Sequence, residues 1–407
     1  MKESNKVVWL LNHYAQEPGS SGGTRHYGLA KHMETMGWDM KIIAASVDHF
    51  TGDQRITNRE SHATNIIDGV SFTWLKTPKY EGSGVFRILN ILCYSFRAYF
   101  GRWKKNISPP DVIIGSSVHP FAAIAAAFLA KKHSVPFIFE VRDLWPETLI
   151  AMGRWSEHSI KTKIFRIIEK WLYMNADKII TLLPYANEYI ESLGVPRNKI
   201  SWISNGAEIS SPPSSLNQKD TFTLMYFGSH GPANSLDTIL EAMSILQVDK
   251  SMSHVSLRLI GDGASKASLI QTSIHLNLTN VFFEKSVTKE EIPKLAEEAD
   301  AFVIPIGNRP ELYRYGISPN KIFDYLSAAR PIVIASNAAN NPIEDANAGL
   351  TTEPDNPEKL AQSIKKLVNT PFEIRVQMGS NGRKHVEDNY SYEKLAQKMV
   401  STLDSIN

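Results

Sequence analysis

Residues 222–246, FTLMYFGSHGPANSLDTILEAMSIL, place a short apolar run, a glycine-rich turn and a helical stretch in direct succession. The run Phe222–Phe227 is nearly unbroken, as expected for a strand that is covered on both faces of a parallel sheet. Gly228–Gly231 supplies the turn, and a helix is expected over Ser235–Leu246. This order of elements predicts a βαβ unit of an α/β domain.

The same order recurs along the chain. Apolar runs of strand length are Val7–Leu11, Met40–Ala45, Val112–Ile114, Phe137–Val141 and Lys178–Leu182, then Val255–Ile260, Val281–Glu284, Ala301–Pro305 and Pro331–Ala335. Between the two series lies SSPPSS at 210–215, which has the composition of a linker. We therefore expect two doubly wound, Rossmann-like domains, 1–210 and 220–388, that face a central cleft. A helix within 391–407 should pack back on the first domain.

The composition limits the class and compartment of the protein. Of 407 residues, 43% are hydrophobic and 21% charged, which excludes disordered and fibrous classes. A single cysteine, Cys93, excludes an internal disulfide and a cysteine-built metal site, so a cytoplasmic location is expected. Residues 1–210 carry a net charge of +6 and the remaining residues a net charge of −4. The positive first half could bind an anionic partner, and the alternative is an unevenly charged but solvated surface.

The segment Val85–Lys105 has five basic residues and no acidic one. Polar residues recur every three or four positions (Arg87, Asn90, Tyr94, Arg97, Gly101, Lys104) and leave a wide apolar surface (Phe86, Leu89, Ile91, Leu92, Phe96, Phe100, Trp103). The charges break the run too often for a spanning helix. The pattern favours an interfacial helix on the inner face of the plasma membrane, and the alternative is a buried helix with snorkelling cations.

The segment from Gly316 to Tyr325 carries the first candidate ligand site. Ser318 is a good N-cap and Pro319 a favoured first helical residue, so the helix should present free N–H groups to an anion. The helical spacing puts Asn320, Lys321 and Asp324 on one face, where a carboxylate could accept both hydroxyls of a ribose. The alternative is an ordinary capped helix with a surface aspartate.

Other candidates follow successive strands. In the second domain they are Gly228, Ser229, Gly261, Asp262, Gly263, Ser286 and Val287, which could bind phosphate, ribose and base. In the first domain, Gly22 and Gly23 could close over a diphosphate, or simply form a tight strand–helix turn. Arg25 and His26 could contact acceptor or phosphate.

Together these blocks resemble the family 4 retaining glycosyltransferases, which have the GT-B fold. The resemblance rests on the segment Tyr315–Pro331, on Glu140–Glu147 (EVRDLWPE), on Gly22–Tyr27, on Ser204–Glu208 with Asn205, and on Gly228–Asp237. The second, third, fourth and fifth blocks are similar to the subgroup that includes N-acetyl-fucosamine transferases of O-antigen and capsule assembly. Two departures concern charge: Gly316 replaces the first of two family glutamates, and Ser229-His230 replaces an Arg and Lys pair.

The resemblance implies retaining transfer of an N-acetylated or deoxy hexose from a UDP-sugar to a lipid-diphosphate-linked or glycan acceptor. Donor contacts carry over to Asn205, Ser318, Pro319, Asn320, Lys321 and Asp324, and Lys321 is nominated as the cation for the diphosphate, with Arg309 and Arg314 as further candidates. No Asp-x-Asp pair occurs, so no metal and no other cofactor is expected, and no nucleic acid partner is implied.

Three residues of the first domain are further catalytic candidates. Arg142 and Asp143 follow the strand Phe137–Val141, where Asp143 could orient or deprotonate the acceptor or could only cap a helix. His119 follows the strand Val112–Ile114, and a lone histidine at such a place is often structural.

Two rival functions stay open: a UDP-sugar epimerase of the same architecture, and a non-catalytic nucleotide-sugar-binding subunit. A nicotinamide dehydrogenase is disfavoured, because no Gly-x-Gly-x-x-Gly follows a strand with an acidic residue at the required distance.

Overall fold

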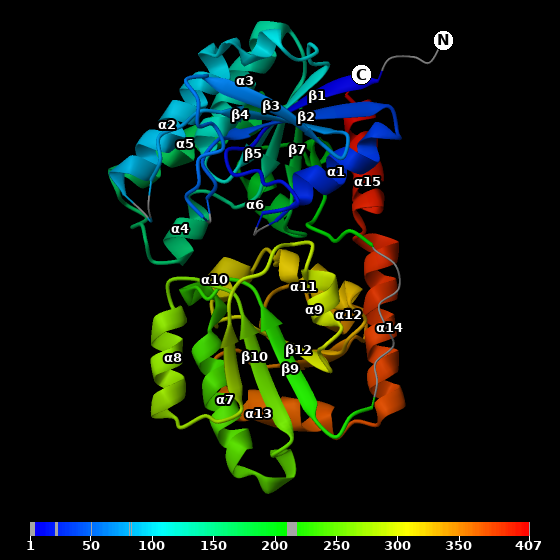
Figure 1. Cartoon of the computed structure of the whole chain (residues 1–407). Helices are drawn as coiled ribbons and strands as arrows, with labels where there is room; N and C mark the ends of the chain where they lie inside the picture. Colours follow the sequence, from blue (N-terminus) through cyan, green and yellow to red (C-terminus); the bar gives the residue numbers. More distant parts are fainter. Residues whose placement is uncertain are drawn as a thin grey trace. The chain divides into compact units, whose positions relative to one another are not determined.

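The computed structural model describes residues 5–20, 23–49, 51–80, 82, 84–209 and 218–406. The chain forms two compact units, of which unit 1 is Met1–Ser204 with Tyr392–Asn407 and unit 2 is Asn205–Ser391 (Figure 1). The division falls at residue 204, a few residues before the boundary predicted near 208–220, and the predicted linker residues 210–217 lie outside the described residues.

Unit 1 contains an eight-stranded sheet in the order β3-β4-β2-β1-β5-β6-β7-β8 among its described residues. Every neighbouring pair is parallel except β3 and β4. The strands are β1 Lys6–Leu11, β2 Trp38–Ala45, β3 His62–Ile67, β4 Val70–Leu75, β5 Val112–Ser117, β6 Phe137–Val141, β7 Lys178–Thr181 and β8 Ile200–Trp202. The central strands are buried along almost their whole length, because helices cover both faces of a doubly wound sheet.

The described residues of unit 2 form a six-stranded parallel sheet in the order β11-β10-β9-β12-β13-β14. Its strands are β9 Phe222–Phe227, β10 Val255–Ile260, β11 Val281–Glu284, β12 Ala301–Pro305, β13 Ile332–Ala335 and β14 Gly349–Thr352. The predicted α/β class with two doubly wound sheets is therefore confirmed.

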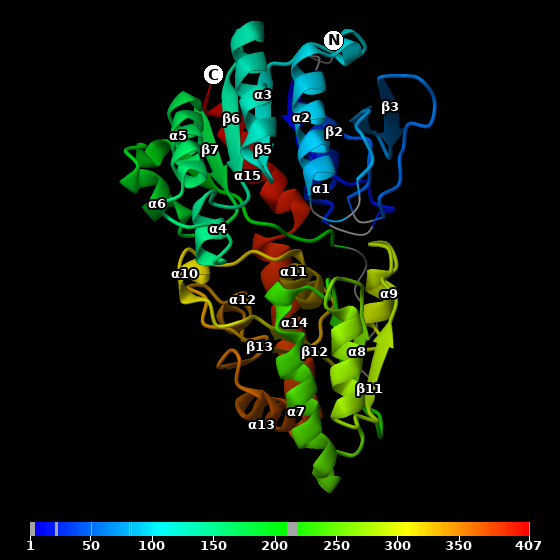
Figure 2. The ribbon, with the colours of Figure 1, turned by 90° about the vertical axis from the view of Figure 1, so that its left-hand side faces the viewer.

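Most of the helices lie between successive strands of the chain, and the last three follow the final strand β14 (Figures 1 and 2). In unit 1 they are α1 Arg25–Glu34, α2 Val85–Phe100, α3 Pro120–His133, α4 Glu147–Ala151, α5 Ile160–Asn175, α6 Ala186–Ser192 and α15 Tyr392–Asp404, with 3₁₀ turns at Arg102–Lys105 and Arg197–Lys199. In unit 2 they are α7 Leu236–Val248, α8 Lys266–His275, α9 Ile292–Ala296, α10 Pro310–Tyr313, α11 Asn320–Ser327, α12 Pro342–Asp345, α13 Pro357–Val368 and α14 Phe372–Asn389, with 3₁₀ turns at Pro232–Asn234 and Lys250–Met252.

Helix α15 belongs to unit 1, where it packs against α1. Its residues Leu395, Met399 and Leu403 are buried in the same core as Leu29 of α1. The contact needs a glycine at position 28, because a Cβ there would lie 2.2 Å from the ring of Tyr392.

The segment 85–105 differs from the single helix expected. Helix α2 ends at Phe100, and Gly101 separates it from the 3₁₀ turn Arg102–Lys105. Trp103, expected on the apolar surface, is buried and donates from its indole N–H to the carbonyl of Arg97 at 3.1 Å. None of the described helices is long and apolar enough to span a bilayer.

Candidate functional site

Ligands of doubly wound sheets bind at the carboxyl ends of the strands, where the strand order reverses. In unit 1 this reversal lies between β1 and β5, and in unit 2 between β9 and β12. His13 follows β1 and His119 follows β5, while Gly228 follows β9. His119 and Gly228 are predicted candidates that lie at the reversal point of their own unit, whereas His13 was not predicted.

Two glycine turns of unit 2 touch through their backbones. A Cβ on Gly261 would lie 1.9 Å from the carbonyl oxygen of Gly228, and a Cβ on Gly263 would lie 2.6 Å from that of His230. Both glycines also have positive φ, at 147° and 157°. These glycines are required to pack the β10 turn on the β9 turn, and contact with a ribose stays a prediction.

Asp262 joins the turns that follow β10 and β11. One carboxylate oxygen accepts from the Lys266 ammonium at 2.9 Å, and the other accepts from the backbone N–H of Ser286 at 3.0 Å. The hydrogen bond from Lys266 and then that from Ser286 lower the pKa of Asp262 to about 2. Asp262 and Ser286 therefore hold these turns in place, and Val287 packs at the edge of the adjacent core.

His230 is fully buried beside Gly263, and neither ring nitrogen has a hydrogen-bond partner among the described residues. Burial lowers its pKa to about 4, so the imidazole is neutral near pH 7. His230 therefore does not supply the positive charge that the resembled family has at this turn.

Lys321 reaches the β9 turn from the first turn of α11. Its ammonium donates to the Tyr226 hydroxyl at 2.7 Å and to the Asn234 side-chain oxygen at 2.6 Å, and it lies 4.5 Å from the centre of the Tyr226 ring. The described residues include no carboxylate within ion-pair distance of it, and burial lowers its pKa to about 7. A cation without a counter-charge beside Gly228 is suited to an anionic ligand.

The placement of Lys321 depends on Tyr325, one helical turn further along α11. The Tyr325 hydroxyl donates to the carbonyl of Phe227 and accepts from the N–H of the same residue, each at 2.8 Å. This pair of bonds fastens α11 to the last residue of β9. The sheet end and the helix start are thus held in one geometry.

The expected cap of α11 is wrong in detail. The helix begins at Asn320, with Pro319 in the N-cap position and in an extended conformation (ψ 138°). The Ser318 hydroxyl instead accepts from the backbone N–H of Asn205 at 2.9 Å, while the Asn205 amide donates to the Ser318 carbonyl at 2.6 Å. Ser318 therefore anchors residue 205 rather than capping the helix.

Asp324 does not stand free on the surface of α11. Its carboxylate forms an ion pair with Lys289, from the loop after β11, and both side chains are largely buried. A ligand hydroxyl that binds Asp324 would either share its carboxylate with Lys289 or displace the Lys289 ammonium from it.

In unit 1, Arg25 and His26 lie in a buried network around Glu140. The Arg25 guanidinium donates to Glu140 at 3.0 Å and to the carbonyls of Ile203 and Ser204, and His26 contacts the second Glu140 oxygen at 2.7 Å. Burial would raise the pKa of Glu140, but His26 and Arg25 outweigh it and hold that pKa well below its usual value. The expected phosphate role of Arg25 and His26 does not fit this arrangement, because these groups are enclosed and already bonded.

His119 begins α3 as its N-cap residue. It is buried, both of its ring nitrogens lack partners among the described residues, and burial followed by the charge of Arg87 lowers its pKa to about 3. The ring of His13 lies 4.9 Å away, and that histidine is held by the Asn90 side chain at 2.6 Å. His119 is therefore a neutral group with unused hydrogen-bonding capacity at the sheet reversal.

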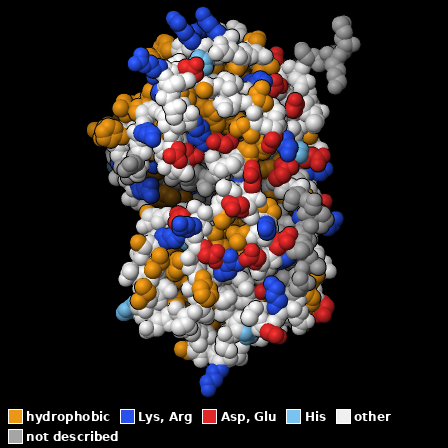
Figure 3. Space-filling view, in the orientation of Figure 1, with side chains coloured by type: hydrophobic (Ala, Val, Ile, Leu, Met, Phe, Trp, Pro, Cys, Tyr) orange, Lys and Arg blue, Asp and Glu red, His pale blue; other side chains and the backbone are white. Residues whose placement is uncertain are grey.

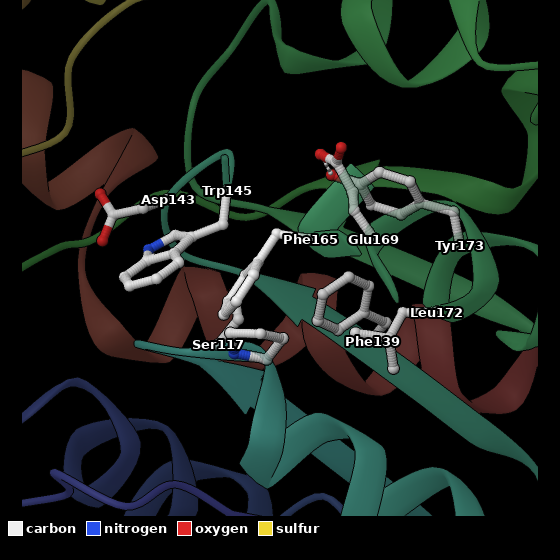
Figure 4. Close-up of a pocket in the computed structure, with 9 residues that line it drawn as sticks. Ser117, Phe139, Asp143, Trp145, Phe165, Glu169, Leu172 and Tyr173 are labelled. Carbon is white, nitrogen blue, oxygen red and sulfur yellow. Dashed lines mark hydrogen bonds between the residues drawn. The ribbon is translucent and has the colours of Figure 1, made fainter. Parts of the chain in front are cut away.

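Asp143 lies at the edge of an aromatic pocket after β6 (Figure 4). Its carboxylate points away from the rings of Trp145 and Phe165. It does not cap α4, which begins at Glu147 with Pro146 as its N-cap residue. Its neighbour Arg142 has its backbone N–H bonded to the Ser117 hydroxyl at 3.3 Å.

The pocket contains a buried acid that sequence reasoning missed. Glu169 accepts from the Tyr173 hydroxyl at 3.2 Å and from the Tyr189 hydroxyl at 2.8 Å. Burial raises the pKa of Glu169 to about 8, despite these two bonds. The spacing of Glu169 and Tyr173 by four residues on one helix was the available signal.

Of the two first-domain glycines, Gly22 lies outside the described residues. Gly23 is described and precedes α1, and its role at a diphosphate stays a prediction. Arg314 pairs with Glu311 on the surface at 3.4 Å.

Comparison with known proteins identifies the family. Residues 22–206 match the family described as "Glycosyl transferase 4-like domain", and residues 221–370 match "Glycosyl transferases group 1". The chain belongs to the GT-B glycosyltransferases. Together the two matches cover most of this transferase, so the predicted enzyme class and fold are confirmed.

The relatives of the transferase are distant. The "Probable glycosyltransferase WbjE" of Pseudomonas aeruginosa is 22% identical over 69% of this chain and 71% of its own. Among solved structures, sucrose-phosphate synthase from Thermosynechococcus elongatus has a TM-score of 0.75 at 15% identity, covering 99% of both chains. HepE of Anabaena, in complex with UDP and glucose, has a TM-score of 0.66 at 16% identity, covering 98% of this chain and 100% of its own. The N-acetyl-fucosamine transferase subgroup stays a prediction.

Proposed function

We propose that the transferase moves an N-acetylated or deoxy hexose, with retention, from a UDP-sugar to a lipid-diphosphate-linked or glycan acceptor in the assembly of O-antigen or capsule. One observation carries the donor half of the proposal. The Lys321 ammonium, which has no carboxylate partner among the described residues, lies beside the Gly228 turn, on the helix that also presents Asp324. A diphosphate and a ribose need these two groups, a cation and a carboxylate, close together.

In this proposal the acceptor oxygen forms a bond to the anomeric carbon on the face from which UDP departs. The bond between that carbon and the diphosphate oxygen breaks, and the diphosphate takes the acceptor proton. Lys321 stabilises the charge that develops on the leaving diphosphate. Asp143, Arg142 and His119 are the groups of unit 1 proposed to position the acceptor.

The relatives support this choice of substrates without fixing it. HepE was solved with UDP and glucose, and WbjE carries the name of a glycosyltransferase. Transfer without a metal or other cofactor is also part of the proposal, and activity should survive EDTA. We further propose that the enzyme works in the cytoplasm, and that a lipid-linked acceptor would bring it to the inner face of the plasma membrane through Val85–Lys105.

Release of UDP from a panel of UDP-sugars, with and without a lipid-linked acceptor, tests the proposal. Release that depends on the acceptor is the expected result. Release without acceptor, accompanied by an altered sugar, would indicate an epimerase. Nucleotide binding with no turnover on any donor would indicate a non-catalytic subunit.

The ion pair of Asp324 offers a matched pair of variants. Asp324→Asn and Lys289→Met both break the pair, but only Asp324→Asn removes the charged acceptor for ribose hydroxyls. We expect Asp324→Asn to raise the donor KM by at least about tenfold, and Lys289→Met to leave it within a few-fold of wild type. An equal effect of the two variants would mean that the ion pair only stabilises the fold.

A further inference from the structure

Helix α2 is amphipathic, and its polar side faces inward. Asn90, Tyr94 and Ala98 are its buried residues. Asn90 bonds His13 and the carbonyl of Pro78, and the Tyr94 hydroxyl donates to the carbonyl of Ile43. The apolar side is left in solvent: Val85, Phe86, Ile88, Leu89, Leu92, Phe96 and Phe100 are all exposed, by 46% to 78%.

Helix α5 has the same inverted arrangement. Its buried side carries Thr162, Glu169, Leu172 and Tyr173, whereas Ile160, Ile164, Ile167 and Met174 are exposed. Ile160, Ile164 and Ile167 are three or four residues apart and Met174 follows two helical turns later, so the four form one apolar stripe. Such a stripe in solvent indicates an interaction surface.

The two stripes are joined across α3, which lies between the helices (Figure 2). Phe128 of α3 is half exposed, and its ring centre lies 6.3 Å from that of Tyr99 on α2 and 5.5 Å from that of Trp171 on α5. We call the exposed apolar residues of α2, α3 and α5 the three-helix face. In Figure 3, hydrophobic side chains gather along the edge of unit 1 where α2 lies, with Lys and Arg side chains at its upper end.

The charge of this surface selects its partner. The segments 85–105, 120–133 and 160–175 contain eleven Lys and Arg residues, and their single acidic residue is the buried Glu169. Arg166 is neutralised by Glu147 and Glu157. The other Lys and Arg side chains of these segments have no acidic neighbours within the segments that would neutralise them in the same way. Two copies of the face would therefore repel each other. An anionic lipid surface, by contrast, complements both the positive charge and the apolar side chains.

We infer that the three-helix face docks on an anionic lipid bilayer, with α5 and Phe128 contributing as well as α2. This inference deepens the proposed membrane contact of Val85–Lys105 and extends it to a second helix. The Asn90 side chain bonds α2 to His13, which follows β1 at the sheet reversal of unit 1. Docking therefore presents the acceptor side of the enzyme at a fixed distance from the lipid surface.

Co-sedimentation of the full chain with vesicles of phosphatidylcholine alone, or with added phosphatidylglycerol, tests the inference. No sugar donor or acceptor is present, so the outcome is independent of the proposed transfer reaction. Binding is expected only to the anionic vesicles and should weaken as salt is raised. Lys161→Glu with Lys163→Glu should weaken binding at least about 25-fold, because each basic residue near such a surface contributes a factor of about five.

The apolar part is tested by Ile164→Ser with Ile167→Ser, and the matched control is Val248→Ser with Ile274→Ser, two exposed apolar residues of unit 2. The first pair should lose binding and the control should retain it, with unchanged circular dichroism in both. Unaltered binding of the α5 variants would overturn the contribution of α5. Failure to bind anionic vesicles, or a dimer that the same substitutions dissolve, would overturn the inference as a whole.

Discussion

Capture of the donor by the transferase should fall as the pH rises through about 7, because Lys321 loses its charge there. The diphosphate of a nucleotide sugar keeps its charge across this range, so only the protonated lysine offers it a counter-charge. With a pKa of about 7, roughly one tenth of the free enzyme carries the charge at about pH 8, so kcat/KM for the donor should be about tenfold lower than at its plateau. In the complex the bound anion raises the pKa of Lys321, and kcat should depend on pH less steeply.

The assay is UDP release at saturating acceptor between about pH 6 and about pH 9. Lys321→Arg keeps the charge and should remove the alkaline fall. Lys321→Met should lower kcat by about 10²–10³ at pH values where the wild-type lysine is charged, since it deletes one stabilising group at the leaving diphosphate. It also leaves Tyr226 and Asn234 without a donor, at a stability cost of about 1 kcal/mol for each lost bond, which thermal unfolding can check. Lys359→Met, an exposed lysine of unit 2, is the control.

A flat profile in the wild type would refute the assignment of Lys321 as the diphosphate cation. So would the same alkaline fall in Lys321→Arg.

The other expectations concern stability. Glu169 has a pKa of about 8 in the folded state against about 4.5 when unfolded. Its contribution to the free energy of unfolding is therefore fully present below about pH 4.5 and is lost as the pH rises through about 8. Glu169→Gln should raise Tm relative to wild type at about pH 9 and not at about pH 5. Gly261→Ala places a methyl group 1.9 Å from a backbone oxygen, so both Tm and the affinity for UDP should fall, Tm by several degrees. The control is Gly19→Ala, whose methyl group contacts no other atom and should leave Tm unchanged. Arg25→Met leaves Glu140 charged, buried and without its guanidinium, so denaturant unfolding should show a loss of about 3–5 kcal/mol, and Arg25→Met with Glu140→Gln should recover part of it.

The sequence predicted what depends on local pattern. Buried parallel strands are continuous apolar runs, and the glycine turns after them are short-range signals, so both sheets and the Gly228 and Gly261 turns could be found without a structure. The strands β3 and β4 were missed, because β3 is largely exposed and the buried β4 alternates apolar residues with Ser71 and Thr73, so neither gives a continuous apolar run. The signal that could have found them is Asp68-Gly69, which joins them with two positive φ angles.

The errors concern side chains whose partners are distant in the sequence. Arg25 and Glu140 are 115 residues apart, and nothing near either one shows that they will meet in the interior. The two sides of α2 were identified correctly as polar and apolar, but the partners of its polar side, His13 and the carbonyls of Pro78 and Ile43, could not be found from the sequence. The ion pair of Asp324 with Lys289 was equally invisible.

The return of α15 to unit 1 has a consequence for the order in which the chain can fold during synthesis. Unit 2 is one continuous segment and has all its residues once Ser391 has left the ribosome. Unit 1, although it is begun first, lacks Leu395, Met399 and Leu403 of its core until the residues after 391 have followed. A chain cut off after Ser391 would therefore keep a complete second unit attached to a first unit whose α1 still exposes Leu29 and Met33, and chaperones should recognise that exposed surface.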